Sequence, residues 1–138
     1  MKTSSLAAFV ALGSYSCSAL VRHLDLPAKW NQGVAFSIGG GFSSWAVMSG
    51  FVVLVVLSVS IPWRSSEKTW GLAFLWGGAV ANLMDRLLYG AVMDYIPVPW
   101  PGGLSVNAAD GALGIGVVLL AWDLYRRRGV RPAKKNTP

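Results

Sequence analysis

Three of the six acidic residues in this chain interrupt apolar stretches, where a charged side chain needs a reason. They are Asp85, Asp94 and Asp110. Two carboxyl groups in one site can share a proton, because both cannot easily ionise side by side. One carboxylate can then act as general base on a water molecule while the other group donates a proton to a carbonyl oxygen. This is the chemistry of an aspartic peptidase, which uses no metal and forms no covalent intermediate.

Amides and one guanidinium accompany these acids at helical spacing. Asn82, Asp85 and Arg86 follow one another at i, i+3 and i+4, which places them on one face of a helix. Asn107 and Asp110 are three residues apart in the next apolar stretch. A short loop that carries the third acid joins the two stretches. We therefore expect three carboxylates, two asparagines and an arginine to meet where the two helices are connected.

Other site chemistries have little support in the sequence. Cys17 is the single cysteine and His23 the single histidine, which argues against a zinc site and against a histidine base for a serine nucleophile. We expect neither a metal nor another cofactor. A structural interpretation stays open, in which Arg86 pairs with Asp85 or Asp94 and holds two helices together.

The composition predicts an integral membrane protein. Of the 138 residues, 54% are apolar and 13% are charged, against about 45–50% and 25% in soluble domains, and the mean hydropathy is +0.49. The net charge of +6 comes from residues 126–138, which hold six basic residues and no acid. Such a tail fits contact with anionic lipid. A nucleic-acid surface needs cations spread over a folded face, so we expect no nucleic-acid partner.

Gaps between charges predict four transmembrane helices, since a spanning helix needs about 20 mostly apolar residues. In a single domain of residues 1–125, followed by the basic tail, the predicted spans are 3–21, 42–63, 69–89 and 105–125. Cations at Lys2, in the 64–68 turn and in the tail then lie on one side, which the positive-inside rule makes cytoplasmic together with both termini. The predicted fold class is an all-α membrane protein, with Arg22 and His23 in the outer connection between the first two spans.

Asp85 and Asp110 are predicted at the same depth in the membrane, near its outer face. Asp110 lies about 24 Å from Arg126 and Asp85 about 22 Å from Trp70, at 1.5 Å per helical residue. The connecting loop with the third acid lies outside the membrane, so the predicted site is close to the outer surface. The other acids are expected in water; they are Asp25, Glu67 and Asp123.

Four sequence motifs resemble those of prolipoprotein signal peptidase, the signal peptidase II family. In chain order they are NQGVAFS (residues 31–37), GGAVANLMDR (77–86), VMDY (92–95) and VNAAD (106–110). Four motifs in the family's order, over roughly residues 30–122, are more specific than any one alone. The resemblance implies a four-helix intramembrane aspartic endopeptidase of the bacterial inner membrane, with its active site near the periplasmic face. Such enzymes remove the signal peptide from diacylglyceryl-modified prolipoproteins by cutting before the lipidated cysteine.

The resemblance also implies a role for each matching residue. Asp94 and Asp110 would be the catalytic pair. Substrate binding or support of this pair would involve Asn31, Asn82, Arg86 and Asn107. Asp85 would orient Arg86 or stabilise the outer ends of the helices. The partners would be lipid-modified prolipoproteins and membrane lipids, and we expect a monomer.

Two features depart from the family pattern. The family has an Asp-Gln-x-x-Lys-like stretch in its first helix, whereas the first helix predicted here has no charge after Lys2. The outer segment before Asn31 is also shorter than usual. We therefore expect the small extracytoplasmic β-structure between the first two helices to be reduced, which affects substrate clamping and leaves the catalytic pair untouched.

Two alternatives to a peptidase remain open from the sequence. The first is a non-catalytic membrane protein, a diverged relative that binds lipidated peptides without cutting them. The second is a small ion or proton transport subunit that uses the intramembrane acids. Transport favours polar residues throughout the bilayer, but residues 70–79 and 114–122 carry none beyond tryptophan.

Overall fold

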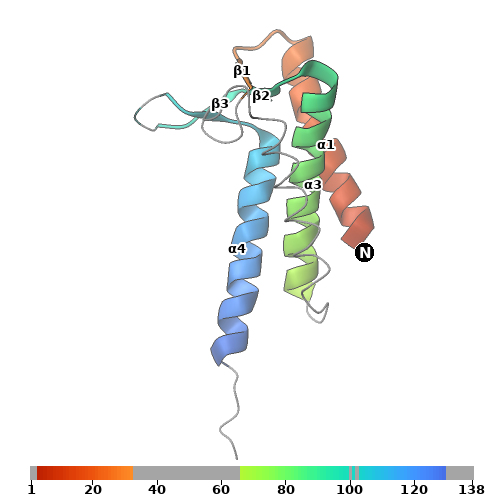
Figure 1. Ribbon diagram of the computed structural model, residues 1–138, viewed down its shortest axis with the longest axis vertical. Coiled ribbons are helices and arrows are strands. Elements are labelled where there is room, and N and C mark those ends of the chain that lie inside the picture. Colours follow the sequence, from red (N-terminus) through yellow and green to blue (C-terminus); the bar gives the residue numbers. More distant parts are fainter. Residues whose placement is uncertain (1–2, 33–65, 100, 102, 130–138) are drawn as a thin grey trace, which may run out of the picture.

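The structure is a computed structural model that describes residues 3–32, 66–99, 101 and 103–129. In this part of the chain, α3 lies between two other long helices and packs against both (Figure 1). The bounds of the helices are Thr3–His23 for α1, Ser66–Tyr89 for α3 and Ala108–Gly129 for α4. The second predicted span, residues 42–63, lies outside the described residues.

Short strands gather at one end of the helices (Figure 1). Their bounds are Lys29–Asn31 for β1, Val92–Asp94 for β2, Ile96–Pro97 for β3 and Ser105–Val106 for β4. β1 pairs antiparallel with β2, and β3 with β4. The β-structure expected after the first helix is thus present as β1, but its partner comes from the connection between α3 and α4. This pairing places Lys29 opposite Asp94 and Asn31 opposite Val92.

The helix boundaries differ from the predicted spans in four places, one of which is the start of α3, at Ser66 instead of residue 69. α1 continues through Arg22 and His23, because Arg22 finds an anionic partner on α3. α4 begins at Ala108, later than predicted, since β4 precedes it and Asn107 caps its first turn. At its other end α4 runs to Gly129 and so includes the start of the predicted tail.

Of the three acids expected in water, Glu67 lies in a helix instead of the predicted loop, and Asp123 is buried. Glu67 is the second residue of α3, which begins at Ser66. Asp123 is buried, with 7% of its surface exposed, because α3 and α4 are in close contact as far as Leu120, one turn before it. Asp25 is exposed in the turn that follows α1.

The described part of the chain is mostly helical, and two of its helical segments are long and apolar enough to cross a membrane. They are Thr3–His23 and Ala108–Arg126. α3 has 24 residues, which is also long enough to span. It is less apolar than the other two because it carries the polar group that begins at Asn82.

Glycines allow α3 to approach both neighbours closely. A Cβ atom at Gly77 would lie 2.5 Å from Val10 of α1, and one at Gly78 would lie 2.5 Å from the carbonyl oxygen of Ala109 in α4. No real side chain tolerates such contacts without movement of the backbone. Small residues at helix contacts give this close packing in membranes. Gly78 therefore fixes the height at which the first turn of α4 lies against α3.

The Gly78→Ala variant is expected to unfold more easily and to push the first turn of α4 away from α3. Overpacking of this kind costs about 1–3 kcal/mol. Gly111→Ala is the matched control, because a Cβ atom at Gly111 meets nothing within 4 Å and the higher helix propensity of alanine contributes about 0.5–1 kcal/mol of stability. Denaturant unfolding in detergent measures both variants. Equal shifts of the same sign in the two variants would contradict this packing.

Candidate active site

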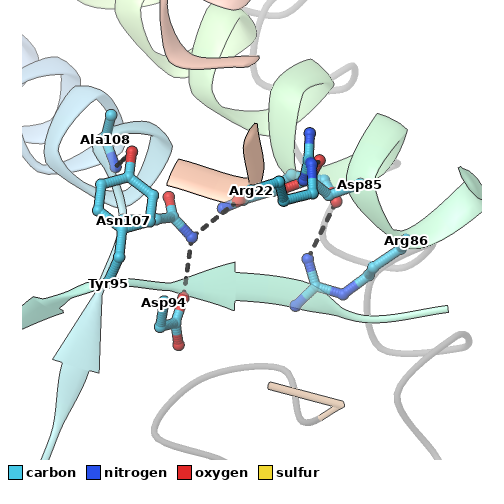
Figure 2. Close-up of polar contacts among 8 residues, drawn as sticks. Arg22, Asp85, Arg86, Asp94, Tyr95, Asn107 and Ala108 are labelled. Atoms are coloured by element: carbon cyan, nitrogen blue, oxygen red, sulfur yellow. Dashed lines mark hydrogen bonds and ion pairs between the residues drawn. The ribbon is translucent and has the colours of Figure 1, made fainter. Parts of the chain in front are cut away.

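Asn107 connects the two acids predicted to form the catalytic pair. Its Nδ2 donates a hydrogen bond to Oδ1 of Asp94 at 2.9 Å (Figure 2). Its backbone N–H donates to Oδ2 of Asp110 at 3.2 Å, and its Oδ1 accepts from the Asp110 N–H at 3.0 Å. This reciprocal pair caps the N-terminus of α4, with Asn107 as N-cap and Asp110 at position N3. One residue thus fixes both carboxyl groups.

Asn82 and Arg86, four residues apart on α3, form the second half of the site. Asn82 donates from Nδ2 to Oδ1 of Asp110 at 2.9 Å and accepts on Oδ1 from Asn107 at 3.3 Å. The backbone carbonyl of Asn82 accepts from Nη1 of Arg86 at 3.2 Å. The guanidinium is therefore held over the last turns of α3, beside the two acids.

Asn31 reaches the site from β1. Its Nδ2 donates to Oδ2 of Asp94 at 2.9 Å, so each oxygen of this carboxyl group accepts one amide hydrogen. The antiparallel register makes this possible, because it places β1 beside the strand that ends at Asp94. The contact joins residues 63 positions apart in the sequence.

A cavity of about 290 Å³ collects the predicted site residues. The six that line it are Asn31, Asn82, Arg86, Asp94, Asn107 and Asp110. A second cavity of about 650 Å³ lies between the segment before β1 and the β3–β4 hairpin. Asp94, Leu104 and Ser105 line both cavities, so Asp94 forms part of the boundary between them.

Burial raises the pKa of the Asp94 carboxyl group above its ordinary value. Hydrogen bonds from Asn31 and Asn107 favour the carboxylate and offset part of this rise, whereas the nearby charge of Asp110 adds to it. The positive charge of Arg86 lowers the pKa by a smaller amount. Only 5% of Asp94 is exposed, which explains why burial is the largest cause.

Asp85 lies outside the cavity, although it shares a helix with two residues that line it. Its Oδ1 forms an ion pair with Nη1 of Arg22 at 3.2 Å. The guanidinium of Arg22 also lies over the rings of Tyr89 at 4.4 Å and Tyr15 at 5.4 Å. The contact joins the C-terminal ends of α1 and α3. Asp85 thus pairs with Arg22, which was predicted to lie in the connection between the first two spans.

Sequence reasoning missed two residues near the site. Arg22 was assigned to the outer connection because the uncharged stretch ends before it, yet a cation one position past an apolar helix is a candidate partner for a buried acid. Tyr95 was noted only as the last letter of the VMDY motif. Its phenol oxygen accepts a hydrogen bond from the N–H of Ala108 at 3.1 Å (Figure 2).

The arrangement is suited to activating water between two carboxyl groups. Asp94 and Asp110 meet through Asn107 at the end of the helices, where the strands begin. A carboxyl group with a raised pKa keeps its proton to higher pH than an ordinary aspartate and can donate that proton to a carbonyl oxygen. In the described part of the chain, no three His, Cys, Asp or Glu side chains gather closely enough to hold a metal ion.

Comparison with known proteins identifies the same family as the four sequence motifs do. The family model described as signal peptidase (SPase) II matches residues 4–126. The lipoprotein signal peptidase of Paraburkholderia phymatum is 35% identical over 84% of this chain and 75% of that protein. Those of Pseudomonas putida and Pseudomonas aeruginosa PAO1 are 34% and 36% identical, over 72% of this chain and 64% of theirs.

Solved structures share the fold. A bacterial membrane enzyme determined by the in meso method at 2.3 Å resolution matches with a TM-score of 0.81, over 98% of this chain and 94% of that one, at 19% identity. A second bacterial membrane enzyme, determined by the same method at 1.9 Å, matches with a TM-score of 0.75 at 21% identity. The resemblance suggested by the four motifs is confirmed: the chain belongs to the signal peptidase II family of peptidases.

Proposed function

We propose that this chain is an aspartic endopeptidase that removes the signal peptide from diacylglyceryl-modified prolipoproteins by cleaving before the lipidated cysteine. The observation that carries the proposal is the bridging of Asp94 and Asp110 by Asn107 inside one cavity. Family membership supports the same activity. It does not favour the two alternatives, a non-catalytic binder of lipidated peptides or an ion transport subunit.

In the proposed mechanism, Asp94 holds the proton that the pair shares and Asp110 acts as base. Asp110 takes a proton from the water that attacks the scissile carbonyl, while Asp94 donates its proton to the carbonyl oxygen. Asn107 keeps the two groups in place, and Asn82 orients the carboxylate of Asp110. As the tetrahedral intermediate collapses and its C–N bond breaks, Asp110 gives its proton to the leaving amine. Asp94 takes back the proton of the hydroxyl group as the carboxyl product forms, which restores the starting state.

The remaining polar groups have supporting roles in this proposal. Asn31 holds Asp94 from the other side, and Arg86 lies close enough to contact a peptide carbonyl in the cavity. Asp85 acts structurally, through the ion pair with Arg22 at the outer helix ends. No metal or cofactor takes part in these steps.

We also propose four transmembrane helices with both termini in the cytoplasm, in a single domain followed by a basic tail. Two features support this topology. β1 lies at the strand end of the helices and α3 starts at the opposite end (Figure 1), which is the arrangement that the proposed second span requires. The site lies at the strand end, which the charge distribution assigns to the periplasmic side of the inner membrane.

A defined precursor tests the proposed function. The purified chain in detergent or liposomes is incubated with a diacylglyceryl-modified precursor and, separately, with the same precursor lacking the lipid. We expect mass spectrometry to find cleavage directly before the lipidated cysteine and only in the modified precursor. Binding of the lipidated precursor without any product would identify a non-catalytic binder. Voltage-driven ion flux in liposomes, again without product, would favour the transport alternative.

The pH–rate profile is expected to report the proton held by Asp94. The neutral carboxyl group is the active form, so activity falls as pH rises through the pKa of this group. Because burial raises that pKa, the basic limb lies above the range of an ordinary aspartate. Removing the Asn31 amide in Asn31→Ala takes away a bond that favours the carboxylate, and the basic limb moves to still higher pH.

The matched control for this prediction is Gln32→Ala, an exposed neighbour of Asn31. Its basic limb stays where it is in the unmodified chain. The charged groups around Asp94 are the same in both variants: Asp110 on α4, Arg86 on α3 and Lys29 on β1. A shift to lower pH in Asn31→Ala would contradict the assignment of the proton to Asp94.

A further inference from the structure

Tyr95 is bonded to the residues on both sides of Asn107. It directly follows Asp94, and its backbone N–H donates to the carbonyl oxygen of Val106 at 3.1 Å. Its phenol oxygen accepts from the backbone N–H of Ala108 at 3.1 Å (Figure 2). Together with the bond from Asn107 to Asp94, these contacts form three successive bonds between residues 94–95 and residues 106–108.

The phenol fills a gap in the cap of α4. The first N–H groups of a helix have no partner within the helix. The side chain of Asn107 accepts a hydrogen bond from the N–H of Asp110. The N–H of Ala108 lies two residues earlier and needs another acceptor. The phenol oxygen accepts this hydrogen, so the first turn of α4 depends on a side chain that sits next to Asp94 in sequence.

A third contact ties the same hydroxyl group to α1. The side chain of Ser18 hydrogen-bonds with the phenol, and this serine is buried, with 5% of its surface exposed. Burial raises the pKa of Tyr95, and the bonds from Ala108 and Ser18 offset only part of the rise. The phenol therefore stays neutral at physiological pH and joins three elements: the β2–β3 connection, α4 and α1.

We propose that Tyr95 is a positioning residue for the catalytic pair. Its hydroxyl group fixes the end of β2, which carries Asp94, to the first turn of α4, which carries Asp110. The inference rests on the proposed function. Ring packing alone does not need the oxygen atom, because phenylalanine fills the same space. The hydroxyl group accounts for the bonds to Ala108 and Ser18, and the separation of the two carboxyl groups depends on the first of these.

The Tyr95→Phe variant tests the hydroxyl group. We expect kcat for the lipidated precursor to fall about tenfold, the size of effect of one lost hydrogen bond with a buried N–H left unpaired. KM stays within about twofold, since the ring that lines the second cavity remains. Tyr125→Phe is the matched control, because Tyr125 is exposed near the far end of α4, and it leaves both constants unchanged.

A double-variant cycle separates positioning from general loosening of the fold. As a single change, Ser18→Ala is expected to lower kcat. In the Tyr95→Phe background it causes no further loss, because Ser18 acts through the hydroxyl group that this background lacks. Ser14→Ala is the control, since Ser14 is a buried serine one turn earlier on α1. Unchanged kcat in Tyr95→Phe would overturn the proposal. So would independent, multiplicative losses from Ser18→Ala and Tyr95→Phe.

Infrared titration of the Asp94 carboxyl group, assigned with Asp94→Asn, gives a readout that does not require turnover. In Tyr95→Phe the end of β2 is held less firmly and water reaches the carboxyl group of Asp94. The titration midpoint of this group therefore moves down towards that of an ordinary aspartate. If the unmodified chain does not cleave the precursor, the proposed function fails. The midpoint shift then still decides whether Tyr95 positions Asp94, and an unchanged midpoint overturns that inference.

Discussion

Replacing either Asp94 or Asp110 with asparagine is expected to abolish cleavage of the lipidated precursor while the chain remains folded and inserted. An amide has the size of the carboxyl group but can neither accept the proton of the attacking water nor hold the shared proton. General acid–base catalysis by one group contributes about 10²–10⁴-fold. Because the two carboxyl groups work as one unit, we expect either single variant to lose on the order of 10⁴-fold in kcat.

The hydrogen-bond geometry explains why the fold should survive. Asp94 accepts amide hydrogens from Asn31 and Asn107 on its two oxygens. An asparagine here keeps one of these bonds directly, and rotation of a neighbouring amide by 180° restores the other. The cost in stability is then close to that of one hydrogen bond, about 1 kcal/mol. Thermal unfolding in detergent checks that the variants are folded.

Asp25→Asn is the control for this pair of variants. It makes the same chemical change in an exposed turn, where the backbone φ of 49° is a left-handed conformation that asparagine adopts readily. Its cleavage rate matches that of the unmodified chain. Full activity of either Asp94→Asn or Asp110→Asn with the lipidated precursor would refute the aspartic mechanism.

The second large effect is expected on stability, from Arg22→Ala. This change leaves the carboxylate of Asp85, whose side chain is 4% exposed, without its ion-pair partner. Removing one member of a buried pair costs about 3–5 kcal/mol, because a buried charge remains uncompensated. The rings of Tyr15 and Tyr89 also lose the cation that lies over them. We expect a fall of about 3 kcal/mol, since the arginine itself is 16% exposed.

Denaturant unfolding in detergent measures this effect, with His23→Ala as control. His23 is exposed in the same last turn of α1, and its removal changes stability by less than about 0.5 kcal/mol. The double variant Arg22→Leu/Asp85→Leu recovers most of the loss, because an apolar pair has no charge to desolvate. Equal stabilities of Arg22→Ala and His23→Ala would show that the ion pair does not hold α1 to α3.

The amino-acid sequence alone predicts the three helices that the structure describes, apart from their exact ends, and the residue types of the site. The uncharged stretch from Thr3 to Val21 is long enough to span a bilayer, and the structure has a helix there. The spacing of Asn107 and Asp110 follows from local geometry, since three residues separate an N-cap from position N3. Family motifs added Asn31, which no periodicity in the sequence connects to the acids.

Only the tertiary structure decides which groups meet. The register between β1 and β2 brings Asn31 to Asp94 across 63 residues, and backbone pairing between distant strands depends on how the helices pack rather than on local spacing. For the same reason Asp85 pairs with Arg22 across α1 and α3, and the phenol of Tyr95 reaches Ala108. Local sequence sets helical faces and caps, because these involve residues within one turn. Contacts between elements depend on the depth and rotation of whole helices, which close packing at Gly77 and Gly78 fixes.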